Sequence, residues 1–395
     1  MDRGKSLLTN IFSLLAWVSF SIVFLFYGCY FIVLIYFYRR NSPSKKTEAD
    51  VNPFVSIIVP VHNEEKVIVQ KMQNIEELEY PNDRIEVIFV DGQSTDRTPQ
   101  LITDQALRCR KSIRLIKQER RDGYTNAVIR GILDSQGEIV VAMDAASYHY
   151  PDALKRLVGH FAESEIGAVT GKEIVLGDSK QLGPQLEKSY RYLYDFMRKA
   201  ETKMDLTADS KGEILAVRRE ICVSLIPRLR LSVNASFDSC VPYQAKLMGY
   251  RTIYDDLARY YEHAPASFND RMKVQIRRAT VLIAPLFMFK NMILNKKFGL
   301  FGMLIMPVHF IIDCLLPGLF MFGIASLVIA TVLNPIGVII IWGAAAVAIV
   351  ASRKSRSILL SFIQSQFALF VALFRLAGRR KSLFIESVQS TRVQK

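Results

Sequence analysis

The chain has 395 residues, half of them hydrophobic, and a formal net charge of +14 from 51 basic and 37 acidic side chains. A chain of this length has room for two or three domains. The positive charge would suit a nucleic-acid-binding protein, but the sequence contains no helix-turn-helix, zinc-finger or RNA-recognition pattern, which argues against that class. The five cysteines form no C-x-x-C pair and therefore predict neither a disulfide framework nor a zinc site.

The first apolar segment lies near the N-terminus. Residues Ile11 to Tyr38 carry no charged side chain, and about 20 apolar residues are enough to span a bilayer. The segment is too long for the apolar core of a signal peptide, and no small-residue cleavage site follows it. We therefore expect residues 1–38 to form a retained transmembrane anchor, followed by a polar linker over residues 39–53.

Residues 54–280 have the composition of a soluble domain in which strands and helices alternate. Strands are expected at 54–60, 86–91, 113–117, 138–143, 166–175 and 213–218. Helices are expected at 64–74, 98–108, 125–135, 151–162, 184–204, 238–248 and 267–280. This alternation predicts an α/β domain with a mostly parallel sheet and helices on both faces. Neither G-x-G-x-x-G nor G-x-x-x-x-G-K-[ST] is present, which argues against a dinucleotide-binding enzyme and a P-loop NTPase.

Residues 281–395 return to a membrane-like composition and are expected to form interfacial and transmembrane helices with a basic tail. Their apolar segments are 300–333, 335–352 and 358–376. The first two are predicted spans, with a break at Pro317 and Gly318. The third precedes the basic run Arg379 to Lys381, and basic residues favour the cytoplasmic side. We therefore expect an interfacial or re-entrant helix there, with a further span as the alternative if Pro317 divides the first segment into two short helices.

Basic residues cluster at the edges of these apolar segments. Arg39, Arg40, Lys45 and Lys46 follow the first segment, and Arg353 to Arg356 follow the segment 335–352. Such flanks mark the cytoplasmic side of a membrane and attract anionic lipid head groups. We expect a multi-pass protein of the cell membrane that contacts the lipid bilayer and has a cytoplasmic soluble domain.

The first two predicted strands both end in polar turns. The run F-V-S-I-I-V-P-V-H-N-E-E places Pro60, His62, Asn63 and Glu64 at the first of these ends. The second strand, in E-V-I-F-V-D-G-Q-S-T-D-R, delivers Asp91 at its carboxyl end, which is where ligands of open α/β sheets bind. A carboxylate at a buried strand end is costly unless it has a use, which favours a functional role for Asp91. Asp96, in the same turn, is expected to cap a helix.

Two later turns carry further charges. Arg120 and Arg121 open the turn R-R-D-G-Y-T-N-A after the third strand. Arginine forks suit phosphate oxygens, although a solvated basic turn would have the same sequence. The fourth strand, in V-V-A-M-D-A-A-S-Y-H-Y-P-D, ends at Asp144, where a carboxylate would suit a divalent cation on a diphosphate. His149, farther along, is expected to be a surface histidine.

Asp238 lies eleven residues before the turn Gly249-Tyr-Arg. A helix N-cap is one role that an aspartate takes at such a position. In order and spacing, these motifs resemble a membrane-bound family-two glycosyltransferase, related to processive polysaccharide synthases and polyprenyl-phosphate sugar synthases. The resemblance implies a GT-A-like, Rossmann-like domain flanked by transmembrane helices. It implies nucleotide-sugar contacts from Pro60, His62, Asn63, Glu64, Asp91, Arg120, Arg121, Asp144, Gln275 and Arg278, with Asp144 in the D-x-D metal motif and Asp238 as catalytic base.

The chain departs from the family pattern at four positions. Tyr124 stands where a lysine is common, Ala146 replaces the second aspartate of D-x-D, Phe237 replaces a glutamate, and Ala279 replaces the tryptophan of Q-x-x-R-W. The second aspartate is normally a metal ligand. A divalent cation, Mg²⁺ or Mn²⁺, would then be held by Asp144 with help from the diphosphate and water, or the metal requirement would be lost.

The resemblance implies an inverting transferase that moves a sugar from a UDP- or GDP-sugar to a hydroxyl of a lipid-linked or glycan acceptor. A polyprenyl-phosphate sugar synthase is one alternative, although its phosphate acceptor is already anionic and needs no base. A processive polysaccharide synthase is a second, against which the missing tryptophan and the few C-terminal spans argue mildly. The departures from the family pattern favour a third, a catalytically degenerate membrane scaffold.

Overall fold

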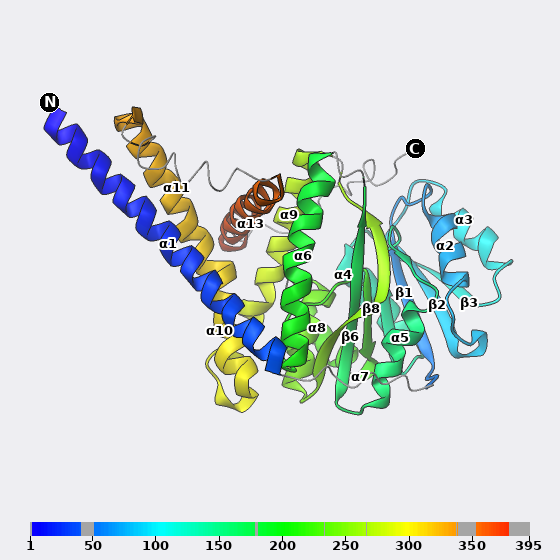
Figure 1. The fold of residues 1–395 in the computed structure, drawn as a ribbon. Coiled ribbons are helices and arrows are strands. Elements are labelled where there is room, and N and C mark those ends of the chain that lie inside the picture. The colour runs from blue at the N-terminus through cyan, green and yellow to red at the C-terminus, as the bar shows by residue number, and fades with distance from the viewer. Residues whose placement is uncertain are drawn as a thin grey trace.

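An eight-stranded sheet and a set of long apolar helices make up the described part of the computed structural model (Figure 1). The described residues are 2–40, 51–177, 181–232, 234–265, 267–336, 338 and 353–378. Most of the predicted linker, most of the predicted span 335–352 and the basic run Arg379 to Lys381 lie outside them.

The sheet has the strand order β3-β2-β1-β4-β7-β6-β8-β5. The strands are β1 (Val55–Val61), β2 (Ile85–Asp91), β3 (Ser112–Lys117), β4 (Ile139–Met143), β5 (Tyr148–His149), β6 (Ile166–Leu176), β7 (Ile214–Arg218) and β8 (Arg251–His263). The four strands from β3 to β4 are parallel, as is the pair β6 and β8, whereas β7 is antiparallel to both its neighbours. Consequently the carboxyl ends of β1, β2 and β4 meet at one edge of the sheet, where Val61 pairs with Asp91.

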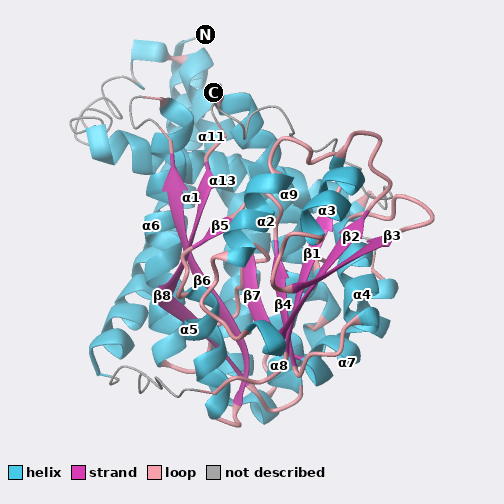
Figure 2. Ribbon diagram, turned by 90° about the vertical axis from the view of Figure 1, so that its right-hand side faces the viewer, coloured by secondary structure: helices cyan, strands magenta, loops and turns pink. Residues whose placement is uncertain are grey.

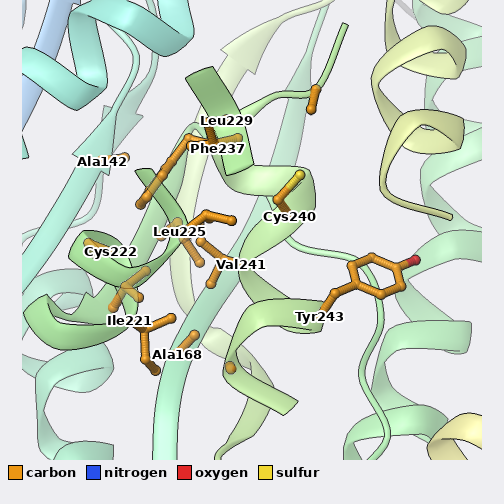
Figure 3. Close-up of a cluster of buried hydrophobic side chains, with 14 of the residues drawn as sticks. Ala142, Ala168, Ile221, Cys222, Leu225, Leu229, Phe237, Cys240, Val241 and Tyr243 are labelled. Carbon is orange, nitrogen blue, oxygen red and sulfur yellow. The ribbon is translucent and has the colours of Figure 1, made fainter. Parts of the chain in front are cut away.

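Helices cover both faces of this sheet (Figure 2). They are α2 (Ile68–Glu76), α3 (Thr98–Ala106), α4 (Tyr124–Asp134), α5 (Ala153–Gly159), α6 (Leu182–Lys203), α7 (Arg219–Arg230), α8 (Phe237–Leu247) and α9 (Phe268–Met288). Short 3₁₀ turns are η1 (Asn82–Arg84), η2 (His160–Ala162), η3 (Lys290–Met292) and η4 (Lys296–Phe298). Successive strand residues alternate between two cores: Ile58 packs with α4, α7 and α8, and Ile57 packs with α2 and α5. Figure 3 shows part of the first core, with Ile221, Leu225 and Phe237 in contact.

The predicted α/β fold with a mostly parallel sheet is confirmed, and the six expected strands are all present within one or two residues of the predicted bounds. The sequence analysis missed α7, β5 and β8. The strand β8 contains six charged or histidine side chains in R-T-I-Y-D-D-L-A-R-Y-Y-E-H, so it lacks the apolar pattern of a strand. It forms because β6 pairs with it over almost its whole length. Helix α9 continues to Met288, past the expected domain boundary at residue 280.

Three described helices are long and apolar enough to cross a membrane: Gly4–Arg40, Phe301–Leu333 and Arg356–Ala377. They correspond to α1 (Asp2–Arg40), to the continuous run η5 (Phe301–Ile305), α10 (Met306–Phe310), η6 (Ile311–Leu315) and α11 (Leu316–Leu333), and to α13 (Arg353–Ala377). The turns η5 and η6 are π-helical, and the predicted break at Pro317 coincides with the start of α11.

Helices α1 and α11 pack against each other and extend away from the sheet (Figure 1). Helix α13 is seen almost end-on in the same view, so it runs at a large angle to that pair, and it packs along α9. The interfacial helix expected in this part of the chain stays a prediction. Because the first part of the second candidate span, including Phe301 and Ile305, packs into the core of the sheet domain, this candidate span and the sheet share one apolar interior.

Candidate active site

The turns after β1 and β2 are cross-linked by hydrogen bonds. The Asn63 backbone N–H donates to Ser94 Oγ at 2.9 Å, and the Thr95 N–H donates to Asn63 Oδ1 at 2.7 Å. Asn63 has φ of 55°, a left-handed conformation that asparagine tolerates better than most residues. The first turn contains four predicted residues, Pro60, His62, Asn63 and Glu64. They are half-buried and lie next to Asp91. The structure therefore brings the predicted nucleoside-binding residues together.

Asp91 is 2% exposed and is partly engaged by its own loop. Its Oδ1 accepts hydrogen bonds from the Ser94 hydroxyl at 2.5 Å and from the Ser94 N–H at 3.1 Å. The remaining acceptor capacity of the carboxylate is what a base or ribose would use. Asp96 accepts from the Thr98 N–H at 3.0 Å, so it bonds to the first amide of α3, but the N-cap residue itself is Arg97 rather than the predicted Asp96.

The two arginines of the next turn differ in their surroundings. Arg120 is largely exposed and pairs with Asp122 at 2.7 Å. Arg121 lies close enough to His62 to affect it: burial lowers the pKa of His62, and the positive charge of Arg121 lowers it further. Of the two, Arg121 is therefore the one directed toward the nucleoside turn.

A buried lysine supports the turn that follows β4. Lys71, on α2, is fully buried, and its Nζ donates to the Ser147 carbonyl oxygen at 2.8 Å and lies 3.3 Å from His149 Nδ1. Burial lowers the pKa of Lys71 to about 7, and the negative charge of Asp144 opposes this shift. The Lys71 amine and the Asp144 carboxylate are therefore close enough to interact electrostatically.

The prediction that His149 is a surface histidine was wrong. His149 is 2% exposed, because β5 pairs with β8 and holds the ring inside, with Nε2 2.9 Å from the Glu213 carbonyl oxygen. Burial, followed by the charge of Lys71, lowers the pKa of His149 well below its usual value. His149 is therefore a neutral structural link between α2 and the segment before β7.

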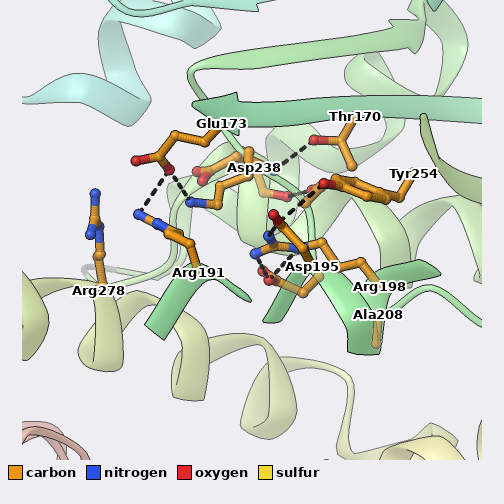
Figure 4. A network of polar contacts seen from close by, with 12 residues as sticks. Thr170, Glu173, Arg191, Asp195, Arg198, Ala208, Asp238, Tyr254 and Arg278 are labelled. Carbon is orange, nitrogen blue, oxygen red and sulfur yellow. Dashed lines mark hydrogen bonds and ion pairs between the residues drawn. The ribbon is translucent and has the colours of Figure 1, made fainter. Parts of the chain in front are cut away.

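The turn after β4 offers one carboxylate to a cation. Ala146 is buried and has no ligand atom, which leaves Asp144. Elsewhere in the described residues, carboxylate oxygens of Glu173, Glu213 and Glu262 lie within 4.8 Å of one another. Lys211 and Arg191 already pair with Glu173 at 2.8 and 2.9 Å, so positive side chains compensate this cluster (Figure 4).

Asp238 is the second residue of α8 and faces Tyr124 across Gly212. A Cβ atom added to Gly212 would lie 2.9 Å from Tyr124 Oη and 3.2 Å from Asp238 Oδ2. The two oxygens therefore flank one small space that glycine keeps open. Ser210 Oγ donates to the Asp238 carbonyl oxygen at 2.5 Å, and the Ser236 hydroxyl donates to the Asp238 carboxylate.

Electrostatics prepare Asp238 to accept a proton. Burial raises the pKa of Asp238 to about 6; the Ser236 hydrogen bond opposes the rise and the charge of Glu213 adds to it. Burial also raises the pKa of Tyr124, and Asp144, Asp238 and Glu213 raise it further, which keeps the phenol neutral and able to donate. The site thus places a base of moderate pKa beside a neutral hydrogen-bond donor.

Gln275 and Arg278, from the Q-x-x-R motif, contact Glu187 of α6. Gln275 Nε2 lies 3.2 Å from Glu187 Oε2, Arg278 Nη1 lies 2.7 Å from Oε1, and the fully buried Arg271 donates to the same carboxylate at 3.1 Å. Burial alone would raise the pKa of Glu187, but Arg278, Arg191 and Arg271 lower it to about 2. Arg278 also reaches within 4.0 Å of Glu213, and therefore borders the site, whereas Gln275 is enclosed between helices.

Several groups at the site were not selected from the sequence. They are Lys71, Tyr124, Gly212, Glu213 and Arg277. The charge of Arg277, next to the selected Arg278, lowers the pKa of Tyr124, so this residue lies near enough to influence the site. Tyr124 stood out as a departure from the family pattern and was the one available signal; the other four have no local motif.

The sheet order and the strand-end carboxylates define a GT-A-type nucleotide-sugar transferase domain. Residues 56–223 match the family model described as glycosyl transferase family 2. The match covers this region of the chain, and the resemblance expected from the motifs is confirmed.

Characterised proteins with similar sequences make glycolipids and polysaccharides. A β-monoglucosyldiacylglycerol synthase of Nostoc sp. is 28% identical over 187 residues, which cover 47% of this chain and 40% of the relative. A poly-β-1,6-N-acetyl-D-glucosamine synthase of Staphylococcus aureus is 24% identical over 262 residues, 64% of this chain and 62% of the relative. The alignment thus spans less than half the length of the cyanobacterial enzyme.

A solved structure shares the fold over most of both chains. The mannosyltransferase PcManGT from Pyrobaculum calidifontis, in complex with GDP-Man and Mn²⁺, superposes with a TM-score of 0.77 at 23% identity. The match covers 92% of this chain and 98% of the archaeal chain. The similarity therefore extends beyond the sheet domain to the helices that flank it.

Proposed function

We propose that the protein is a membrane-embedded inverting glycosyltransferase. It moves a sugar from a UDP- or GDP-sugar to a hydroxyl of a lipid-linked or glycan acceptor at the cytoplasmic face of the membrane. The observation that carries the proposal is the placement of Asp238, whose pKa is raised to about 6, next to Tyr124 and the open space at Gly212. A general base near neutrality is what a hydroxyl acceptor requires.

The proposed step is a single displacement. The acceptor hydroxyl loses its proton to Asp238, and its oxygen forms a bond to the anomeric carbon of the donor. The bond from that carbon to the diphosphate oxygen breaks, and the nucleoside diphosphate leaves with the electron pair. Attack from the side opposite the leaving group inverts the anomeric configuration, and Asp238 later releases its proton to solvent.

The turns after β1, β2 and β4 would hold the donor. Asp91 and the Pro60 to Glu64 turn would bind the nucleoside, and Arg121 would meet a phosphate. Asp144 would hold a divalent cation, which would neutralise charge on the diphosphate when bound. The Mn²⁺ in the Pyrobaculum complex shows that this fold accommodates a cation, and one carboxylate plus diphosphate oxygens and water is a donor set that hard cations accept.

Two observations support an acceptor at the membrane. The first part of the second candidate span packs into the interior of the sheet domain, which joins that domain directly to the candidate membrane helices. The Nostoc relative is named for a glycolipid product. A processive polysaccharide synthase remains the second candidate, favoured by the Staphylococcus relative, which matches 64% of the chain.

The test is nucleoside-diphosphate release by the detergent-purified chain. A panel of UDP- and GDP-sugars is offered with native lipid extract, with and without Mg²⁺ or Mn²⁺. We expect release with one donor, loss of release in Asp144→Ala, and normal release in Asp83→Asn, which removes an exposed carboxylate. Silence with every donor from folded protein would instead support the scaffold alternative.

A further inference from the structure

A second polar site lies on the membrane side of Asp238, in a cavity between α6, α9 and the second candidate span. The cavity is lined mainly by Tyr194, Arg198, Glu201, Asp209, His309 and Asp313. It has room for about one water molecule, and a polar cavity of that size holds a hydroxyl group or a water. Its wall therefore offers charged groups where the surrounding helices are apolar.

Two of these groups belong to a segment predicted to span the membrane. His309 and Asp313 lie one helical turn apart within Phe301–Leu333. His309 Nε2 is 3.1 Å from Glu201 Oε1, and the same oxygen accepts from Tyr30 Oη of α1 at 2.8 Å. Ionisable side chains inside membrane segments are costly and are retained mainly where they line functional paths. The cluster thus connects the first and second candidate spans to α6 through hydrogen bonds to Glu201.

The carboxylates of this cluster are not equally satisfied. Glu201 receives Tyr30, His309 and, at 3.3 Å, the N–H of Ala208. Asp313 is 2% exposed, and its Oδ2 has no hydrogen-bond partner among the described groups. That oxygen lies 3.7 Å from His309 Nδ1, which is beyond hydrogen-bond range. A buried acceptor in this state is stabilised by any ligand hydroxyl that reaches it.

The cavity is next to the catalytic base. Asp209 lines it, and the neighbouring Ser210 donates to the Asp238 carbonyl oxygen at 2.5 Å. Arg198 pairs with Asp209 and, at 3.8 Å, with Asp195, and Figure 4 shows Arg198 and Asp195 in one network near Asp238. A lipid whose head group entered here from the membrane would therefore present its reactive hydroxyl toward Asp238.

The charge of the cavity selects among head groups. Three carboxylates, Glu201, Asp209 and Asp313, face two basic side chains, Arg198 and His309, that are already paired with them, so acidic groups outnumber basic ones in the lining. A phosphate would be repelled by these carboxylates, whereas a hydroxyl would donate to them. We propose that this cavity is an acceptor subsite for one hydroxyl of an uncharged polyol or sugar head group of a membrane lipid, which donates a hydrogen bond to Asp313. The assignment rests on the proposed function and names its acceptor class.

The experiment uses the full chain in lipid nanodiscs with two acceptor probes, monoglucosyldiacylglycerol and undecaprenyl phosphate. We expect transfer to the neutral glycolipid, with an acceptor KM about tenfold higher in Asp313→Asn and a donor KM changed less than twofold. Leu282→Phe, which fills the cavity from α9 without changing its charge, should raise the same acceptor KM. The matched control Thr331→Val removes a hydroxyl from the same span away from the cavity and should change neither constant.

The outcomes distinguish a failure of the proposed acceptor subsite from a failure of the proposed function. Transfer to the neutral lipid with an unchanged acceptor KM in both cavity variants would overturn the subsite while leaving the proposed function intact. Transfer only to undecaprenyl phosphate would overturn the subsite and the hydroxyl acceptor together. No nucleoside-diphosphate release by the unaltered protein would reject the proposed function. If Asp313→Asn fails to fold, the acceptor KM of Leu282→Phe decides.

Discussion

The donor side and the acceptor side of the catalytic space are built differently. On the donor side, β1, β2 and β4 end side by side, and Asp91 and Asn63 are held by hydrogen bonds within short loops. On the acceptor side, Glu187, Arg278 and Asp238 come from helices far apart in the chain and depend on a buried ionic network. Local turns thus form the proposed nucleotide site, whereas tertiary packing positions the proposed base and its surroundings.

The largest effect should come from the base itself. Asp238→Asn removes the proton acceptor while keeping the size of the side chain, and we expect kcat to fall by about 10²–10⁴-fold. Rates of nucleoside-diphosphate release with saturating donor and lipid measure this, with Asp83→Asn as the control. Turnover within twofold of the unaltered protein would show that Asp238 is only a structural residue in the first turn of α8.

The ionic network should matter for stability more than for chemistry. Glu187→Gln leaves three buried arginines without their shared counter-charge, and we expect a loss of about 3–5 kcal/mol in the free energy of unfolding. Thermal or denaturant unfolding in detergent measures it. Asp134→Asn, which breaks an exposed pair with Arg130, should cost less than about 1 kcal/mol. Equal losses of unfolding free energy in both variants would show that the buried network around Glu187 contributes no more to stability than an exposed ion pair does.

The space at Gly212 should be needed for catalysis. Gly212→Ala places a methyl group 2.9 Å from Tyr124 Oη and 3.1 Å from Asp238 Cγ, and we expect kcat to fall by about 10²-fold because both groups are displaced. Donor KM should stay nearly constant, since the nucleotide turns are elsewhere. A variant with unchanged kcat would show that no substrate atom occupies this space.

The pH dependence should follow Asp238. Only the ionised carboxylate accepts a proton, and burial raises its pKa to about 6. We therefore expect kcat/KM to be level above pH 7 and to fall about tenfold per unit well below pH 6. A profile still level at pH 5 would contradict the assignment.

The smallest effect should come from the phenol. Tyr124→Phe keeps the ring but removes the neutral donor beside Asp238, and we expect the acceptor KM to rise up to about tenfold. Steady-state kinetics with varied lipid measure it. A change confined to the donor KM would place Tyr124 on the nucleotide side instead.

What could be predicted from the sequence also differs between the donor side and the acceptor side. Asp91 and Asp144 follow contiguous apolar strands, so their placement could be inferred from local pattern and topology. Lys71 reaches Ser147 across 76 residues, and Glu187 meets Arg278 across 91, and no local pattern encodes such pairings. His149 was assigned to the surface because its partner strand β8 is too polar to be recognised. Asp238 was found only through its spacing from Gly249-Tyr-Arg.

The most direct measurement of the central claim is the acid stability of the lipid product. The chain is supplied with its donor, labelled in the sugar, and with native lipid extract, and the labelled lipid is treated with mild acid. The account predicts label that resists mild acid, as a glycosidic bond to a hydroxyl does, and that is not formed by Asp238→Asn. Label released by mild acid and formed normally by Asp238→Asn would contradict it, because the sugar would then be linked to a phosphate.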